Sequence, residues 1–349
     1  MMQITHGGDV YSTENTGAVD FSANINPLGL PQSVKNAIAA ACGDCEKYPD
    51  PLCRCLRAAL SDYEGVPEQS IFCSNGASEI LYRIAWAFKP RGVLVTAPAF
   101  SEYRQASETV GAEIHLYHLR EENGFEIAPD ILPMIDGTIE IVFICNPNNP
   151  TGIPTPRETI RQIADRCRQT DTLLVVDECF MDFLANGAEC YSAKPLLKEY
   201  DNLILLKAFT KIFAMPGIRL GYCLTGNLDT IERLSVCGQP WSVSTFAQAA
   251  GVAASKEKAF VERSRAYVGT ERTYLARGLA ALGFKVYPSS ANYLFFKADS
   301  ADLKARLLQK GFLIRSCANF DGLDGRYYRA AVRAHDENAA LLGALEALN

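Results

Sequence analysis

Short apolar runs separated by amphipathic segments are the feature that most constrains the fold of this chain. They read GVLVTAP from residue 92, IEIVFICNP from residue 139, TLLVVDE from residue 172 and LILLKAF from residue 203. Runs of this length without polar alternation are typical of strands buried on both faces, and helices between such strands indicate a parallel sheet. The sequence therefore predicts an α/β large domain built on a mostly parallel sheet.

The pattern changes after about residue 250, which predicts a second domain. A long helical stretch is followed by FKVYPSSANYLFFKA, DLKARLLQK, GFLIRSCANF and RYYRAAVRA, which together are typical of a smaller α+β unit. We expect an N-terminal arm at residues 1–47 that packs with the small domain, a large domain at 48–250 and a small domain at 251–349. A chain of 349 residues is long enough for this arrangement.

The composition argues against several classes of partner. A formal net charge of -6 disfavours nucleic acid, because proteins that bind it concentrate positive charge on one face. No apolar run reaches the roughly 18 residues of a membrane span, and the N-terminus has no apolar stretch after a basic segment. We therefore expect a cytoplasmic protein that binds neither nucleic acid nor a membrane.

The chain has twelve cysteines, which in such a protein are expected to be reduced and mostly buried. Cys42, Cys45, Cys53 and Cys55 lie close together in the sequence and raise the question of a metal site. The C-x2-C pair is followed by C-x-C, however, and the two pairs flank a Tyr-Pro-Asp-Pro turn instead of a tight metal knuckle. We expect no metal.

Polar residues suited to chemistry follow three of the predicted strands. CNPNNPTG follows one strand, DECF ends another, and FTK ends a third. Ligands of a parallel α/β sheet bind at the carboxyl ends of its strands, so these motifs are expected to meet there. Lys211 of FTK is the most informative residue. A lysine at this position is usually a solvated strand end, so any chemical role depends on its neighbours.

A lysine that attaches pyridoxal phosphate needs an acid for the pyridine nitrogen, groups that hold the phosphate, and a ring to pack on the cofactor. Asp177 ends an apolar strand, where an unpaired charge is costly to bury. It could pair with a protonated pyridine nitrogen or, equally, cap a helix or pair with an arginine.

Anion and ring contacts can also be identified. Residues 76–78 lie at the expected N-terminus of a helix, where free N–H groups and the helix dipole favour an anion. Arg219, eight residues after Lys211, can add a charge-assisted fork to the same phosphate. Phe100 and Tyr103 offer rings for stacking, although aromatic residues after a strand are more often core residues.

The motifs NPNNPTG, DECF, FTK and PGIRLGY, in this order, resemble the fold-type-I, aspartate-aminotransferase-like family of pyridoxal-phosphate enzymes over nearly the whole chain. The resemblance implies that Lys211 forms the Schiff base, that Asp177 pairs with the pyridine nitrogen and that Asn149 hydrogen-bonds the 3-oxygen of the cofactor. It also implies a homodimer in which Tyr48 reaches the partner's site. The cofactor phosphate would be held by Gly76, Ala77, Ser78, Thr210 and Arg219.

Within this family the arm and the C-terminal region resemble the L-threonine-O-3-phosphate decarboxylases of cobalamin biosynthesis more than the histidinol-phosphate aminotransferases. HGGDV, DFSANINPLGLP and LIRSCANFDGLDGRYYRAAVRA carry this resemblance. Phe180, where many relatives have tyrosine, agrees with it. The resemblance implies conversion of L-threonine O-3-phosphate to (R)-1-amino-2-propanol O-2-phosphate and CO2.

Such a substrate carries two anionic groups, so cationic residues on the arm and the small domain are candidates to bind it. Arg329 matches the carboxylate-binding arginine of the family, and we assign Arg315 and His6 to the substrate phosphate. Asn24 and Arg333 are further candidates, although Asn24 could cap a turn and Arg333 could form a surface ion pair.

Two other classes of function remain open. One is an aminotransferase that acts on histidinol phosphate or another amino acid. The other is a non-catalytic cofactor-binding protein such as a regulator, which is disfavoured because the whole set of Lys211, Asp177, Asn149 and Arg219 is present and no nucleic-acid-binding domain is appended.

Overall fold

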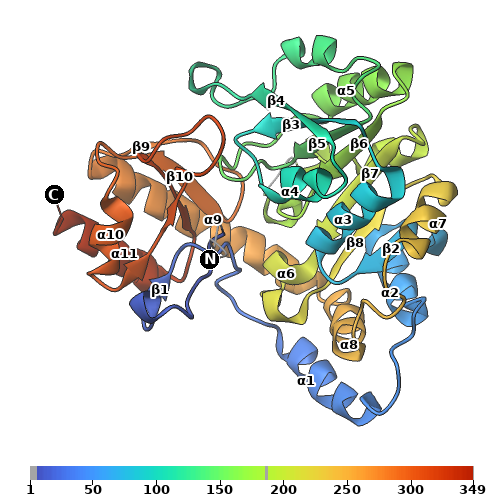
Figure 1. Ribbon diagram of the computed structural model, residues 1–349. Coiled ribbons are helices and arrows are strands. Elements are labelled where there is room, and N and C mark those ends of the chain that lie inside the picture. The colour runs from blue at the N-terminus through green and yellow to red at the C-terminus, as the bar shows by residue number, and fades with distance from the viewer. Residues whose placement is uncertain (1–5, 185–187, 349) are drawn as a thin grey trace.

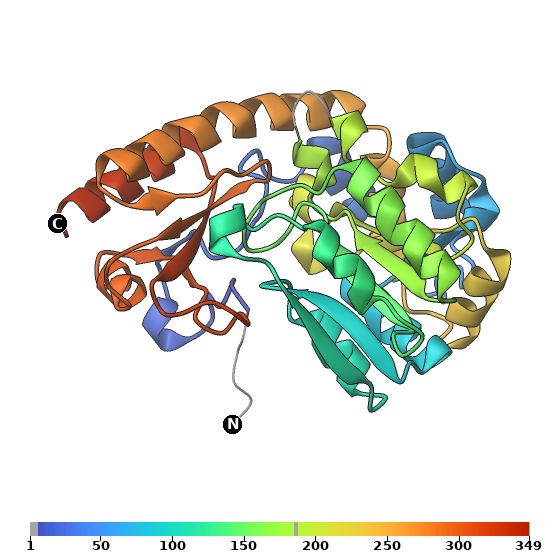
Figure 2. The ribbon, with the colours of Figure 1, turned by 90° about the horizontal axis from the view of Figure 1, so that it is seen from above.

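The computed structural model describes residues 6–184 and 188–348, and the statements below refer to these residues. Two domains lie side by side, and the long helix α9 (Lys258–Ala281) runs along both of them (Figures 1 and 2). The expected domain ranges also include residues 1–5, 185–187 and 349, which lie outside the described residues.

A seven-stranded sheet forms the centre of the large domain, in the order β2-β8-β7-β6-β5-β3-β4. Strand β8 runs antiparallel to both of its neighbours, and the other neighbours pair in parallel. The apolar runs seen in the sequence form β3, β5, β6 and β7, in which every residue is buried. The strands are β2 (Ile71–Ser74), β3 (Gly92–Ala97), β4 (Glu113–His118), β5 (Ile141–Cys145), β6 (Leu173–Asp177), β7 (Leu203–Ala208) and β8 (Gly221–Leu224).

Helices cover both faces of this sheet, because alternate residues of each strand point to opposite sides. In β7, Ile204 and Leu206 join the cluster formed with α3 (Ala77–Phe88), α4 (Glu102–Glu108) and α7 (Leu228–Val236). Leu203 and Leu205 join the opposite cluster, which includes residues of α2 (Arg54–Glu64), α5 (Arg157–Gln169) and α8 (Thr245–Ala254).

The small domain has an antiparallel sheet in the order β12-β13-β10-β9, packed against helices. Its strands are β9 (Lys285–Val286), β10 (Tyr293–Lys297), β12 (Arg315–Ser316) and β13 (Tyr327–Ala331). Its helices, besides α9, are α10 (Leu303–Leu308) and α11 (His335–Glu346).

The N-terminal segment has contacts at two places. Strand β1 (Val19–Asp20) pairs in parallel with β11 (Phe312–Leu313), so this part packs with the small domain. Helix α1 (Gln32–Ala40) instead packs against α8. Since α8 itself packs on α2, the arm contacts elements of both domains.

Two further observations concern membranes and metals. Across residues 6–184 and 188–348, no helix combines the length and apolar character needed to cross a bilayer. All twelve cysteines fall within these residues and are free thiols; Cys53 is buried, whereas Cys42, Cys45 and Cys55 are exposed. No group of three or more histidine, cysteine, aspartate or glutamate side chains in this part of the chain is arranged to hold a metal ion.

Candidate active site

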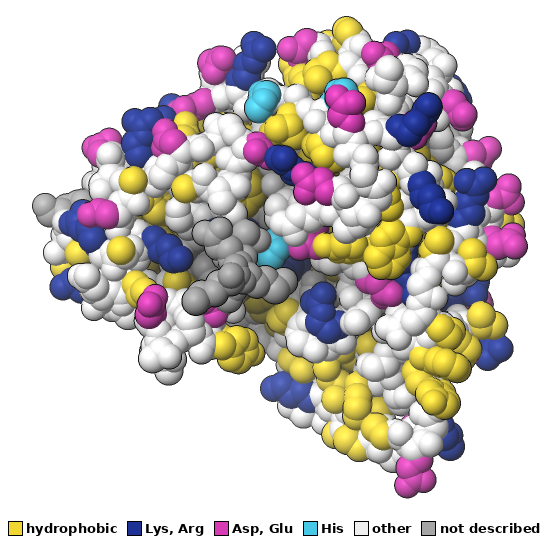
Figure 3. All heavy atoms as spheres, viewed as in Figure 1, with side chains coloured by type: hydrophobic (Ala, Val, Ile, Leu, Met, Phe, Trp, Pro, Cys, Tyr) yellow, Lys and Arg dark blue, Asp and Glu magenta, His cyan; other side chains and the backbone are white. Residues whose placement is uncertain are grey.

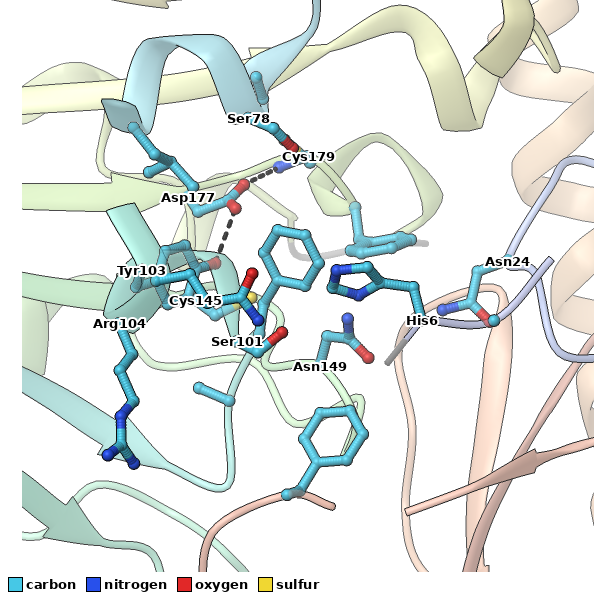
Figure 4. A pocket seen from close by; sticks show the side chains of 18 of the residues that line it. His6, Asn24, Ser78, Ser101, Tyr103, Arg104, Cys145, Asn149, Asp177 and Cys179 are labelled. Atoms are coloured by element: carbon cyan, nitrogen blue, oxygen red, sulfur yellow. Dashed lines mark hydrogen bonds between the residues drawn. The ribbon is translucent and has the colours of Figure 1, made fainter. Parts of the chain in front are cut away.

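A pocket with a volume of about 650 Å³ lies at the carboxyl ends of the parallel strands, between the two domains. Residues from both domains and from the N-terminal arm line it (Figure 4). The site residues predicted from the sequence that contribute to the lining are His6, Asn24, Gly76, Ala77, Ser78, Phe100, Tyr103, Asn149, Asp177, Thr210, Lys211, Arg219, Arg315 and Arg329.

Lys211 projects into the pocket from α6 (Phe209–Ile212), the short helix that directly follows β7. Burial lowers the pKa of its amine to about 8, and the positive charges of Arg329 and Arg219 act in the same direction. The arm holds this helix in place, because the backbone N–H of Asn26 donates to the Lys211 carbonyl at 3.2 Å and its side chain donates to the Ile212 carbonyl. An amine with this pKa is a far better nucleophile near neutral pH than an ordinary lysine.

Asp177 ends β6 and is buried, with 8% of its surface exposed. The hydroxyl of Tyr103 donates to one carboxylate oxygen at 2.7 Å, and the backbone N–H of Cys179 donates to the other at 2.9 Å (Figure 4). These two donors hold the carboxylate in one orientation at the floor of the pocket.

The two aromatic candidates for cofactor stacking have different positions. Tyr103 is fully buried, and its ring stacks on Phe143 at 5.3 Å between centroids, so it supports Asp177 instead of presenting a free face. Phe100 is half-buried at the pocket wall, with its ring centroid 5.6 Å from that of His6. Phe100 is therefore the ring that a planar ligand can contact.

A turn rich in backbone N–H groups lies between β2 and α3. Gly76 has a φ of +85°, and a Cβ on it would lie 2.7 Å from the Nη2 atom of Arg219, so a side chain here would displace the guanidinium. A Cβ on Gly221 would lie 2.2 Å from the Ala77 nitrogen, so glycine is also required there. Arg219 is thereby brought to the N-terminus of α3, a favourable position for a phosphate.

Arg329 on β13 is buried, with 6% of its surface exposed. It donates to the Asn149 side-chain oxygen and, at 2.6 Å, to the Ser22 carbonyl, while its Nε has no hydrogen-bond partner among the described residues. Burial lowers the pKa of this guanidinium. A buried cation held by neutral groups at the wall of a pocket is suited to bind a carboxylate.

Arg315, His6 and Asn24 lie nearby on the small domain and the arm. Arg315 donates to the Ser316 carbonyl and the Asn319 side chain, and burial together with the charge of Arg329 lowers its pKa. His6 hydrogen-bonds Glu102 at 2.9 Å. The Oδ1 atom of Asn24 is buried without a hydrogen-bond partner in the described part of the chain.

Two predicted site residues do not line the pocket. Arg333 donates to the Asp20 carbonyl at 2.9 Å and to Glu337 at 2.7 Å, so it forms the ion pair that was the alternative to substrate binding. Tyr48 is 79% exposed and stacks on Trp241 at 4.6 Å, away from the pocket of its own chain.

The geometry of these groups fits pyridoxal 5'-phosphate. The pocket brings together an amine with a lowered pKa, a buried carboxylate with two donors, a glycine turn beside Arg219 and a half-buried aromatic ring. The amine suits the reactive aldehyde of that cofactor, and the carboxylate suits its pyridine nitrogen. The glycine turn with Arg219 suits the phosphate, and the aromatic ring suits the face of the pyridine ring.

Comparison with known proteins agrees with this geometry. The family "Aminotransferase class I and II" matches residues 16–348. Threonine-phosphate decarboxylase from Salmonella typhimurium is 37% identical over an alignment of 354 positions, which covers 99% of this chain and 96% of that protein. The crystal structure of L-threonine-O-3-phosphate decarboxylase from Porphyromonas gingivalis has a TM-score of 0.83 and 25% identity, covering 94% of this chain and 98% of that one.

Histidinol-phosphate aminotransferases are also similar. The enzyme from Clostridium acetobutylicum has a TM-score of 0.88 and 29% identity, covering 94% of this chain and 98% of that one. The chain belongs to the class I and II aminotransferase family of pyridoxal-phosphate-dependent enzymes. The predicted fold class, the cofactor and the resemblance to threonine-phosphate decarboxylases are thereby confirmed.

Proposed function

We propose that this enzyme decarboxylates L-threonine O-3-phosphate to (R)-1-amino-2-propanol O-2-phosphate and CO2, a product that would serve the aminopropanol arm of cobalamin. The observation that carries the proposal is the presence of Arg329 and Arg315 in the same pocket as Lys211. Two guanidinium groups beside the reactive amine match a substrate with one carboxylate and one phosphate. The full-length similarity to threonine-phosphate decarboxylases supports the same assignment.

We assign the cofactor contacts as follows. Asp177 would face the pyridine nitrogen, Asn149 the 3-oxygen and Phe100 the ring, while Gly76, Ala77, Ser78, Thr210 and Arg219 would hold the phosphate. When bound there, pyridoxal phosphate supplies an electron sink that stabilises negative charge at the substrate Cα.

Arg329 selects the reaction in this proposal. Decarboxylation requires the Cα–carboxylate bond to stand perpendicular to the cofactor ring, and a transamination requires the Cα–H bond there. Arg329 is held by Asn149 and Ser22, so it can fix the carboxylate in one orientation. Arg315 and His6 then bind the phosphate and prevent rotation of the substrate.

Lys211 supplies the proton that replaces CO2 at Cα. In the ligand-free chain burial lowers the pKa of this amine to about 8, so it gives up a proton more readily than an ordinary lysine. Burial of the amine in the pocket, which lowers the pKa, also limits exchange of this proton with water.

We further propose a cytoplasmic homodimer in which Tyr48 completes the partner's site. Tyr48, Leu52 and Trp241 are all exposed, at 79%, 53% and 45%, which is unusual for large apolar side chains unless a partner covers them. Hydrophobic side chains gather at the end of the large domain that carries α1 and α2 (Figure 3). The free thiols support a reducing compartment.

The test uses two reactions with the purified holoenzyme. The first contains L-threonine O-3-phosphate and no 2-oxo acid, and CO2 and the amino-alcohol phosphate are measured. The second contains histidinol phosphate and 2-oxoglutarate, and glutamate is measured. We expect CO2 in the first reaction only. Glutamate in the second reaction without CO2 in the first would replace the proposal with an aminotransferase.

A further inference from the structure

The segment that follows β4, residues 119–127, joins the large domain to the sheet of the small domain; we call it the β4 loop. Its Glu121 carboxylate accepts four hydrogen bonds, all from the small domain. The donors are Lys285 at 2.5 Å, Tyr287 at 2.5 Å, Lys297 at 3.1 Å and Tyr327 at 2.6 Å. Burial opposes ionisation of Glu121, but these four bonds outweigh it and hold its pKa well below the usual range.

Phe125 of the β4 loop makes a second, apolar connection. Its ring packs edge-on against Tyr287, Phe295 and Tyr327, with centroids 5.2, 5.5 and 6.4 Å away. The backbone of Phe125 has a φ of +60°, a left-handed conformation that is strained for a bulky residue. Such strain persists where the surroundings impose it, and it is concentrated at functional sites.

Both connections lie on the face of the small-domain sheet that carries Arg329. Tyr327 and Arg329 are two residues apart on β13, so their side chains share one face. Phe295 of β10 is the register partner of Arg329. On the same face of β10, Tyr293 donates from its hydroxyl to the Asn148 carbonyl at 2.8 Å and packs edge-on against Phe180.

Arg329 therefore lies between two points at which the small domain is attached to the large one. On one side Tyr293 contacts the turn that carries Asn149, and on the other side Glu121 and Phe125 hold Tyr327. Any shift of the small-domain sheet relative to β5 and β7 would move the guanidinium of Arg329 relative to Lys211. Figure 2 shows the segment after β4 reaching towards the small domain.

We propose that Glu121 and Phe125 are positioning residues that fix Arg329 against the large domain and so decide which bond of the bound substrate breaks. This inference rests on the proposed function. A displacement of the carboxylate by about 1 Å can cost roughly 100-fold in rate, and it lets the Cα–H bond take the place of the Cα–carboxylate bond. Loss of the β4 loop contacts therefore changes both the affinity and the reaction.

The first experiment compares Glu121→Ala and Phe125→Ala with the wild-type holoenzyme. Glu122→Gln is the matched control, because Glu122 is an exposed carboxylate on the same turn. We expect a KM for L-threonine O-3-phosphate raised about tenfold or more. We also expect the ratio of 2-oxo acid to CO2 among the products to rise. The amino group of the substrate molecules that leave as 2-oxo acid is retained on the cofactor. Glu121→Gln, which keeps the shape of the side chain, should change both quantities in the same direction by less.

The second experiment is a double-mutant cycle with Arg329→Gln. If Glu121 acts through Arg329, adding Glu121→Ala to Arg329→Gln should change KM by less than about twofold. The proposal would be overturned if the double variant raised KM by the product of the factors measured for the two single variants. So would variants that unfold at a lower temperature while keeping the wild-type KM and product ratio, because the β4 loop would then be only structural.

A third measurement is independent of the substrate. In the cofactor-free full-length chain, the charge of Arg329 helps to lower the pKa of Lys211, together with burial and Arg219, and against the effects of Cys179 and Asp177. Displacement of Arg329 by Glu121→Ala should raise the pH at which Lys211 becomes reactive, whereas Glu122→Gln should not. An unchanged pH would count against the positioning role. A wild-type enzyme that releases no CO2 would instead refute the proposed function, and this measurement would still test the positioning.

Discussion

The reactivity of Lys211 offers the most direct test of the site chemistry. Its pKa is lowered from 10.5 to about 8, mainly by burial. At pH 7 an amine with a pKa of about 8 is roughly 10% neutral, whereas one with a pKa of 10.5 is about 0.03% neutral. Only the neutral amine is nucleophilic, and its fraction at pH 7 is about 300-fold larger for Lys211 than for an ordinary lysine, so Lys211 should be the faster of the two at equal accessibility.

The assay is reductive methylation of the cofactor-free enzyme by formaldehyde and cyanoborohydride, followed by peptide mapping. The rate at Lys211 should rise tenfold per pH unit and level off above about pH 8. Lys207 is the internal comparison. Burial opposes its charge, but Asp182, Glu64 and Glu178 outweigh this effect and raise its pKa above the usual value, so it should stay unmodified.

A charge variant tests the cause of the shift. Arg329→Gln removes a positive charge that lowers the pKa of Lys211, so the pH at which the rate levels off should rise. Arg326→Gln removes an exposed charge that Asp324 already pairs, and it should leave the profile unchanged. A wild-type profile that levels off near pH 10.5, or preferential labelling of Lys207, would refute the reasoning.

Three further predictions concern individual side chains. Asp177→Asn should keep the fold, checked by thermal unfolding, and lower CO2 release by several orders of magnitude, because the cofactor nitrogen loses its carboxylate partner. Tyr103→Phe keeps the packed ring but removes a 2.7 Å hydrogen bond to a carboxylate, worth roughly 1.5–3 kcal/mol, so kcat/KM should fall by up to about 100-fold. His6→Ala and Arg315→Ala should each raise KM for the phosphorylated substrate by at least about tenfold without altering the bound cofactor's absorption spectrum, whereas Arg326→Ala should not.

Much of the large domain could be predicted because its strands are encoded locally. An apolar run such as residues 203–208 predicts a strand buried on both faces. The motif that follows the run must then lie at the carboxyl end of that strand. The location of Lys211, Asp177 and Asn149 in one pocket followed from this. The end of the arm was harder, since helix α1 is amphipathic and its sequence does not say which domain it packs against.

Other features depend on contacts that no motif records. The sequence offers Tyr103 as a stacking ring, but its hydroxyl donates to Asp177 and its ring packs on Phe143. Asn26, two residues after Asn24 in ANINP, has backbone carbonyls of α6 as partners, which no sequence motif predicts. Backbone groups are the same in every sequence, so only the folded chain shows which of them a side chain meets.

The charges in the pocket explain why a substrate with two anionic groups suits this site. Arg329 lowers the pKa of both Arg315 and Lys211, and Arg219 also lowers that of Lys211, which means that these cations repel one another. The negative charge of Asp177 acts on the reactive amine in the opposite direction, but this carboxylate already accepts two hydrogen bonds. The fold tolerates this repulsion before ligands bind, and each anion that enters relieves part of it. A phosphate at Arg219, a carboxylate at Arg329 and a second phosphate at Arg315 would together neutralise the cluster, so the cost of assembling the cations is recovered only when cofactor and substrate are both bound.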